Sequence, residues 1–162
     1  MKHKYLWVGS IIGIVLVLDQ ITKYVVEARI PLHDTIPVIP GFFNLTHVRN
    51  KGAAFGVLAN LPDFWRSAFF ITVTVVALVA IGVLIWKTHE RLSVTAFSLI
   101  AAGAAGNVID RIRYGEVVDF IQWYVKSLYW PSFNVADSAI SIGVALLAVE
   151  MLFNKPHETK GT

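Results

Sequence analysis

The sequence predicts an all-α membrane protein with four transmembrane helices and a small β-containing extracytoplasmic region after the first helix. Composition is the first reason: hydrophobic residues make up 56% of the 162 residues and charged residues only 15%, whereas soluble domains average roughly 45–50% and about 25%. The second reason is that apolar segments close to the ~20 residues needed to cross a bilayer recur four times along the chain. This composition excludes an intrinsically disordered chain, a collagen and a coiled coil.

The first predicted span, residues 5–26, follows Lys2 and Lys4 and is apolar as far as Leu18. A secretory signal peptide begins in the same way, but no small-residue cleavage site follows at the right distance, and three more spans come later. We therefore interpret this segment as a retained span that also serves as the targeting signal.

The other three spans are predicted over residues 67–86, 92–109 and 136–153, within one integral-membrane domain over residues 1–162. The second span carries no charged residue. The third is rich in Ala and Gly, which permits close approach between helices. The fourth begins beside Asp137.

The two extracytoplasmic loops are predicted over residues 27–66 and 110–135. In the first loop, Phe42–Asn50 follows a Pro-Gly turn and is rich in Phe, Val and Thr, which predicts a short strand or hairpin. In the second, Ile121–Trp130 is dense in aromatic residues, as is typical of a segment at the membrane interface.

Four spans place both termini on the same side of the membrane. Six of the 14 Lys and Arg residues lie in the short segments 1–4, 87–91 and 154–162, and the others are spread over longer loops. Because the density of basic residues in short loops sets orientation, we expect both termini in the cytoplasm.

The net charge of +3 is attributed to loops that face anionic lipid headgroups. The sequence has no basic run with interleaved aromatic residues, so no nucleic-acid partner is expected. The absence of Cys excludes disulfides, thiolate nucleophiles and Cys-based metal sites. The His residues are scattered, so we expect neither a metal nor a cofactor, and any chemistry should use Asp, Glu, His, Ser, Lys or Tyr.

Four aspartates, which border the apolar segments or interrupt the second loop, fall on one face of the predicted membrane protein. A carboxylate in or beside hydrocarbon costs on the order of 2.5–3.5 kcal/mol, so we expect a use for them. They are Asp19, Asp110, Asp119 and Asp137.

Two of these aspartates have structural explanations. Asp19 and Lys23 are spaced i,i+4 and could form a neutralised interfacial pair. Asp110 adjoins Arg111 and precedes Arg113 by three residues, so we expect a structural ion pair there.

The other two aspartates suggest catalysis. Asp137 could be a plain helix N-cap, with Asn134 as an alternative cap, whereas Asp119 stands between apolar pairs with no basic residue within three positions. Two carboxylates that share a proton can activate a water and protonate a peptide carbonyl, because like charges split their pKa values. Which aspartate would be the base is left open.

Five short segments stand out in order along essentially the whole chain. They are Asp19-Gln20 with Lys23, Asn50–Gly56 (NKGAAFG), Gly106–Arg111 (GNVIDR), Val117–Phe120 (VVDF) and Phe133–Ser138 (FNVADS). Together they closely resemble the family of lipoprotein signal peptidases, also called signal peptidase II, and the five in order are far more specific than any one alone.

The resemblance implies an aspartic endopeptidase of the bacterial inner membrane, with its site near the outer leaflet. It would remove the signal peptide from a prolipoprotein by cutting just before a diacylglyceryl-modified Cys, and we expect a monomer among membrane lipids that globomycin inhibits. The implied catalytic pair is Asp119 and Asp137. Residues that would bind substrate or inhibitor, or support the pair, are Asp19, Asn50, Gly56, Asn107, Arg111, Asn134 and Ala136.

Three alternatives remain from the residues. A small four-span carrier could use the outer carboxylates as cation or proton sites, with Glu150 as the inward continuation of its path. A membrane scaffold would use the small-residue span only for helix association. A presenilin-like protease would need Gly-x-Gly-Asp, where this chain has Asn-Val-Ala-Asp. We further expect the Asn50–Gly56 loop to close over substrate.

Overall fold

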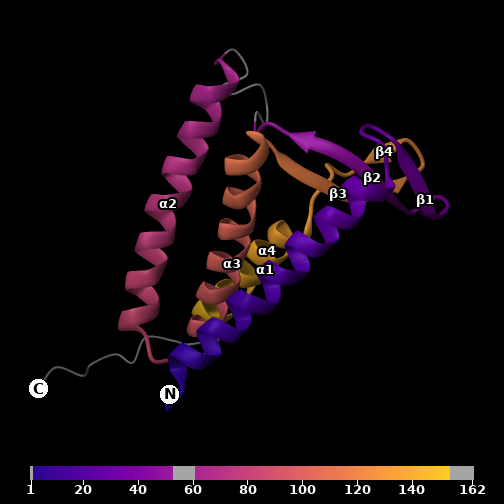
Figure 1. Ribbon diagram of the computed structural model, residues 1–162. Helices are drawn as coiled ribbons and strands as arrows, with labels where there is room; N and C mark the ends of the chain where they lie inside the picture. Colours follow the sequence, from indigo (N-terminus) through magenta and orange to yellow (C-terminus); the bar gives the residue numbers. More distant parts are fainter. Residues whose placement is uncertain (1, 53–60, 154–162) are drawn as a thin grey trace, which may run out of the picture.

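Four long helices dominate the computed structural model, which describes residues 2–52 and 61–153 (Figure 1). Each is long and apolar enough to cross a membrane, so the predicted class, an all-α membrane protein with a small sheet, is confirmed. The helices are α1 (Lys4–Arg29), α2 (Asp63–Lys87), α3 (Arg91–Tyr114) and α4 (Val135–Phe153).

Helix α3 is the centre of the bundle and lies between α2 on one side and α1 and α4 on the other (Figure 1). Small residues explain this position: a Cβ on Gly103 would lie 2.2 Å from the carbonyl oxygen of Ala136, and one on Gly143 would lie 2.7 Å from that of Ala96. The backbones of α3 and α4 therefore approach closely, as small residues allow in membranes.

The helices extend beyond the predicted spans. Helix α3 continues through Tyr114, five residues past its predicted end, and stops at Gly115, whose φ of 75° is left-handed and whose N–H donates to the Arg111 carbonyl oxygen at 2.9 Å. This glycine-terminated end carries Asp110 and Arg111 inside the helix.

A four-stranded antiparallel sheet covers one end of the bundle, in the order β1-β2-β3-β4 (Figure 1). The first two strands form the hairpin expected around Phe42–Asn50. The second two come from the other loop, so the segment 121–130, interpreted as interfacial, is largely strand. The strands are β1 (Thr35–Ile39), β2 (Phe43–Asn50), β3 (Val117–Val125) and β4 (Leu128–Tyr129).

The sheet is fixed to the bundle by an apolar cluster. Val26 and Ile30, at the end of α1, are buried against Phe120 of β3. Strands β2 and β3 pair with Val48 opposite Asp119 and Asn50 opposite Val117. This register places Asp119 close to Asn134, the residue that precedes α4.

Candidate active site

Asp119 is buried in β3, with only 2% of its surface exposed. Both of its carboxylate oxygens accept hydrogen bonds at 2.8 Å, Oδ2 from the Asn50 side chain of β2 and Oδ1 from the Asn134 side chain. Its strand neighbour Val118 is fully buried. The carboxyl group is thus held by two amides in surroundings that contain little water.

Asp137 occupies the first turn of α4, where it forms a reciprocal cap with Asn134. The Asn134 Oδ1 accepts from the Asp137 N–H at 2.9 Å, and the Asp137 Oδ2 accepts from the Asn134 N–H at 3.2 Å. This is the geometry of a capping box. Of the two caps considered, Asn134 is therefore the N-cap. The other Asp137 oxygen accepts from the Asn107 amide at 2.8 Å, so it faces α3.

Asn134 joins the two aspartates. Its side chain is fully buried, and its amide nitrogen lies within hydrogen-bond distance of Asp119, the Val118 carbonyl oxygen and the Asn107 Oδ1. Its side-chain oxygen accepts from the Asp137 N–H, and its own backbone N–H donates to the Asp137 carboxylate. Asn134 therefore contacts both carboxyl groups, that of Asp119 through its side chain and that of Asp137 through its backbone.

A buried charge cluster lies behind the pair. The Lys23 ammonium is 2.9 Å from Asp19 Oδ2 and 2.8 Å from Asp110 Oδ2, and it donates to Asn107 Oδ1 at 3.2 Å. Asn107 in turn donates to Asp137. The charge of Lys23 is therefore linked to the candidate site through one amide.

Asp19 also holds the start of α4. Its Oδ1 accepts from the Ala136 N–H at 3.0 Å, one of the first-turn donors that a helix cannot satisfy internally. The site requires small neighbours, since a Cβ on Gly106 would lie 2.6 Å from Asp19 Oδ2 and 3.3 Å from the Ala136 methyl group.

The expected pairing of Asp110 with the neighbouring arginines is wrong. Asp110 pairs with Lys23 and accepts from the Val118 N–H at 3.1 Å, because its helix face turns toward α1 and β3. Arg113 reaches this cluster only through Gln20, at 3.4 Å. The predicted i,i+4 contact between Asp19 and Lys23 is present.

Arg111 lies beside the pair. Its guanidinium stacks 5.2 Å from the centre of the Phe70 ring, donates to the Asn107 carbonyl oxygen at 3.3 Å and attracts the Asp137 carboxylate electrostatically. The same Phe70 ring packs on Gly52, where a Cβ would lie 2.6 Å from it. Residues 53–60, which include Gly56 and most of the expected closing loop, lie outside the described part of the chain.

Burial also perturbs the titration of the Asp119 carboxyl group. Burial raises the pKa of Asp119 from its ordinary value of 3.8 to about 7, with a contribution from the negative charge of Asp137, against the opposing effect of the Asn50 hydrogen bond. A carboxyl group with this pKa retains a proton near neutral pH, so it can act as an acid there.

These features coincide with a known family. The family profile described as signal peptidase (SPase) II matches residues 11–153. The chain belongs to the signal peptidase II family. It is accordingly a peptidase and a multi-pass membrane protein, and the resemblance noted in the sequence is confirmed.

Relatives support the assignment over nearly the full length. The chain is 47% identical over 162 residues to a lipoprotein signal peptidase of Geobacter metallireducens, and the alignment covers 99% of each protein. It is 48% identical to that of Syntrophus aciditrophicus, covering 86% of this chain and 88% of the relative. A bacterial membrane enzyme solved by the in meso method at 1.9 Å superposes with a TM-score of 0.81 at 37% identity, covering 91% of this chain and 94% of that one.

An apolar cavity of about 520 Å³ opens next to Asp137. It runs from the sheet to the first turns of α4, and most of the side chains that line it are aromatic or aliphatic. From the sequence, Trp123 and Trp130 are expected only as members of an interfacial segment. The lining residues are Ile121, Trp123, Trp130, Phe133, Asp137, Ser138, Ser141 and Ile142.

Two functional candidates were not included among the expected site residues. Lys23 and Asp110 were interpreted as parts of structural ion pairs, yet both belong to the cluster that holds Asn107 and the start of α4. The available signal was Lys23 within the first predicted span, four residues after Asp19.

Proposed function

We propose that this protein removes the signal peptide from diacylglyceryl-modified prolipoproteins by cleaving the peptide bond just before the lipid-modified Cys, with Asp119 and Asp137 as the catalytic pair. The observation that carries the proposal is that Asn134 donates hydrogen bonds to both carboxyl groups, to Asp119 from its side chain and to Asp137 from its backbone, while burial raises the pKa of Asp119 to about 7. The relatives named lipoprotein signal peptidases support a prolipoprotein as the substrate.

In this mechanism Asp137 is the base. Its carboxylate accepts from the Asn107 amide and the Asn134 N–H and sits in the first turn of α4, where the helix dipole stabilises negative charge. It takes a proton from a water as the water oxygen attacks the scissile carbonyl carbon. Asp119, which holds the shared proton, donates that proton to the carbonyl oxygen.

The second half of the reaction returns both groups to their starting states. Asp137 gives its proton to the amine nitrogen of the Cys as the C–N bond breaks. The diol loses a proton to Asp119 and becomes the carboxyl end of the signal peptide. One water is consumed, and Asn50 and Asn134 keep the Asp119 carboxyl group in position throughout.

The position of the site suits a lipid-anchored substrate. The pair lies where the sheet meets the ends of α3 and α4, at the edge of the membrane-spanning helices. We propose that this is the outer-leaflet side of the bacterial inner membrane, with both termini in the cytoplasm. A diacylglyceryl anchor would then hold the scissile bond at the depth of the pair, which lowers the entropic cost of positioning.

The apolar cavity beside Asp137 would receive an apolar part of the substrate. We expect globomycin to inhibit at this site, as the family resemblance implies. A monomer suffices, because both carboxylates and their amide partners come from the same chain. The carrier alternative receives no comparable support, since its inward candidate Glu150 accepts a hydrogen bond from Ser93 at 2.5 Å.

The test uses purified protein in detergent with a diacylglyceryl-modified prolipoprotein, and follows loss of the signal peptide on a gel. Asp119→Asn and Asp137→Asn should each abolish cleavage, because each removes one proton-transfer group at constant shape. Asp34→Asn is the matched control, since Asp34 is an exposed carboxylate before β1. Cleavage that survives in both site variants would refute the aspartyl pair.

A further inference from the structure

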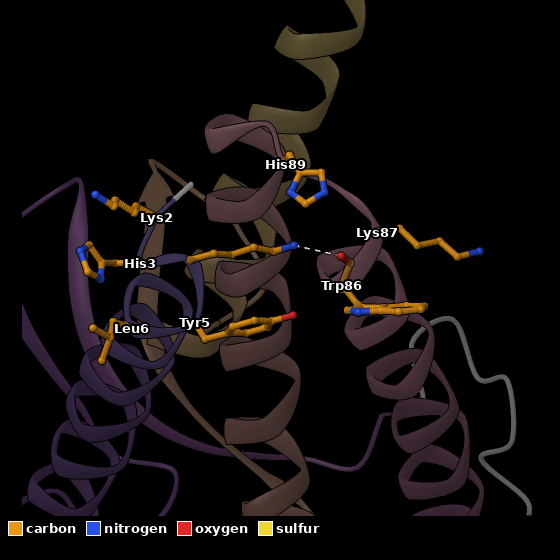
Figure 2. A pocket seen from close by; sticks show the side chains of 8 residues that line it. Lys2, His3, Tyr5, Leu6, Trp86, Lys87 and His89 are labelled. Carbon is orange, nitrogen blue, oxygen red and sulfur yellow. Dashed lines mark hydrogen bonds between the residues drawn. The ribbon is translucent and has the colours of Figure 1, made fainter.

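A second cavity, of about 700 Å³, lies at the opposite end of the bundle from the sheet. It is formed where the start of α1 meets the connection between α2 and α3, near the N-terminus in Figure 1. Figure 2 shows its lining, with Lys2 and Lys87 on opposite rims and the rings of Tyr5, Trp86 and His89 between them.

A buried lysine, Lys4, forms part of the cavity wall. Lys4 is only 6% exposed. Its ammonium donates to the Trp86 carbonyl oxygen at 3.0 Å, the dashed line in Figure 2, and to the Thr88 carbonyl oxygen at 2.7 Å. These carbonyls belong to the end of α2, where a helix leaves acceptors unsatisfied. The contact ties α1 to α2, so the cavity wall is built before any ligand arrives.

Among the described residues, the lysines around this cavity have no acidic partner. Within residues 2–52 and 61–153, the ion pairs found do not include Lys2, Lys4 or Lys87. Burial makes the unpaired ammonium of Lys4 energetically costly. The Trp86 and Thr88 carbonyl oxygens supply only partial negative charge. An anion in the cavity would remove this imbalance.

A neighbouring hollow of about 550 Å³ shares Lys2 and His3 and adds Arg91, whose guanidinium lies 6.0 Å from the centre of the Trp7 ring. The positive-inside rule explains basic residues on this side of the membrane, but it does not require them to surround one cavity. Tryptophan and tyrosine rings at the same level are typical of the lipid headgroup region.

We propose that this cavity binds the phosphodiester headgroup of an anionic phospholipid from the leaflet at this end of the bundle. Basic pockets between transmembrane helices recognise such headgroups, and the volume lies in the range of small-molecule sites. Lys2 and Lys87 are exposed, and their flexible stems allow both ammonium groups to turn toward a phosphate. Tyr5 and Trp86 would contact the glycerol and upper acyl chains.

The test measures lipid binding to the detergent-purified full chain by native mass spectrometry. Phosphatidylglycerol is the anionic probe, phosphatidylcholine is the neutral comparison and inorganic phosphate is the soluble one. Phosphatidylglycerol should bind more tightly than phosphatidylcholine and should not be displaced by equal concentrations of phosphate. Lys2→Gln/Lys87→Gln should weaken its binding by about thirtyfold, or about fivefold per lysine.

The matched control is Arg29→Gln/Lys126→Gln, which removes the same charge from two exposed residues, one at the end of α1 and one between β3 and β4. It should leave phosphatidylglycerol binding unchanged. Equal weakening in the control, equal binding of both lipids, or displacement by phosphate would each overturn the proposal. Signal-peptide cleavage does not enter the readout, so the outcome is independent of the proposed catalytic pair.

Discussion

Replacing Lys23 with methionine should destabilise the protein more than any exposed charge change. Its ammonium lies 2.9 Å from Asp19 and 2.8 Å from Asp110, and the three side chains are at most 3% exposed. Methionine keeps most of the side-chain length of lysine but removes its charge. Lys23→Met therefore leaves the buried carboxylates of Asp19 and Asp110 without the cation between them.

The magnitude follows from this burial. Removing one member of a buried ion pair costs about 3–5 kcal/mol, because an uncompensated charge remains. The donors that remain keep the loss within that range: the Ala136 N–H on Asp19, the Val118 N–H on Asp110 and the Gln20 amide on both carboxylates. We therefore expect the free energy of unfolding to fall by about 4 kcal/mol at neutral pH.

The assay is reversible unfolding in mixed micelles, followed by circular dichroism. Lys23→Met/Asp110→Asn should recover part of the loss, because the substitution removes one of the two facing charges. Lys126→Met, in the exposed turn between β3 and β4, is the control for loss of a lysine. A Lys23→Met variant within about 1 kcal/mol of the parent, or a double variant without recovery, would refute the reasoning.

Three further predictions concern the candidate site and its supports. The folded chain binds more protons than the unfolded one, because the pKa of Asp119 is about 7 in the folded chain and has its ordinary value of 3.8 in the unfolded chain. Stability should therefore fall as pH rises between these values, and pH-dependent unfolding should show Asp119→Asn more stable by about 4 kcal/mol near pH 8; a flat profile would contradict this. Gly103→Ala should lower the melting temperature, because its Cβ meets the Ala136 carbonyl oxygen, whereas Gly82→Ala, with open space around it, should not; equal effects would argue against close α3–α4 packing. Asn134→Ala should lower kcat at least 100-fold with a smaller change in KM, since it removes the amide that holds the Asp119 carboxyl group and the acceptor that caps the Asp137 N–H, and unchanged kcat in a cleavage assay would exclude this role.

The helices were predictable because hydropathy is a local property. Each span is a long apolar run, and a backbone in lipid must satisfy its hydrogen bonds internally. The ends were less predictable: Asp110 and Arg111 continue α3 until Gly115 stops it. The pairing of β2 with β3 was missed, because no local pattern indicates that two loops about 70 residues apart form one sheet.

For the candidate site, the sequence supplied residue identities and not partners. Asp119 stood out as an unpaired carboxylate among apolar neighbours, and the structure brings it to Asn134, as it does Asp137. Asp110 was assigned the wrong cation, because its partner Lys23 comes from another helix, whereas Arg111, as the next residue, lies on a different face of α3. The cavity beside Asp137 depends on side chains from both β3 and α4.

By itself the sequence determined the membrane class, the number of spans and the family, because these depend on composition and on short motifs. Tertiary structure alone decided the partners of the aspartates and the raised pKa of Asp119. Asp19 and the Ala136 N–H that it binds are 117 residues apart, and Asp119 has a raised pKa only because strands and helices from the whole chain exclude water from it. Burial and hydrogen bonding are properties of assembled neighbours, so they become defined only when the chain has folded.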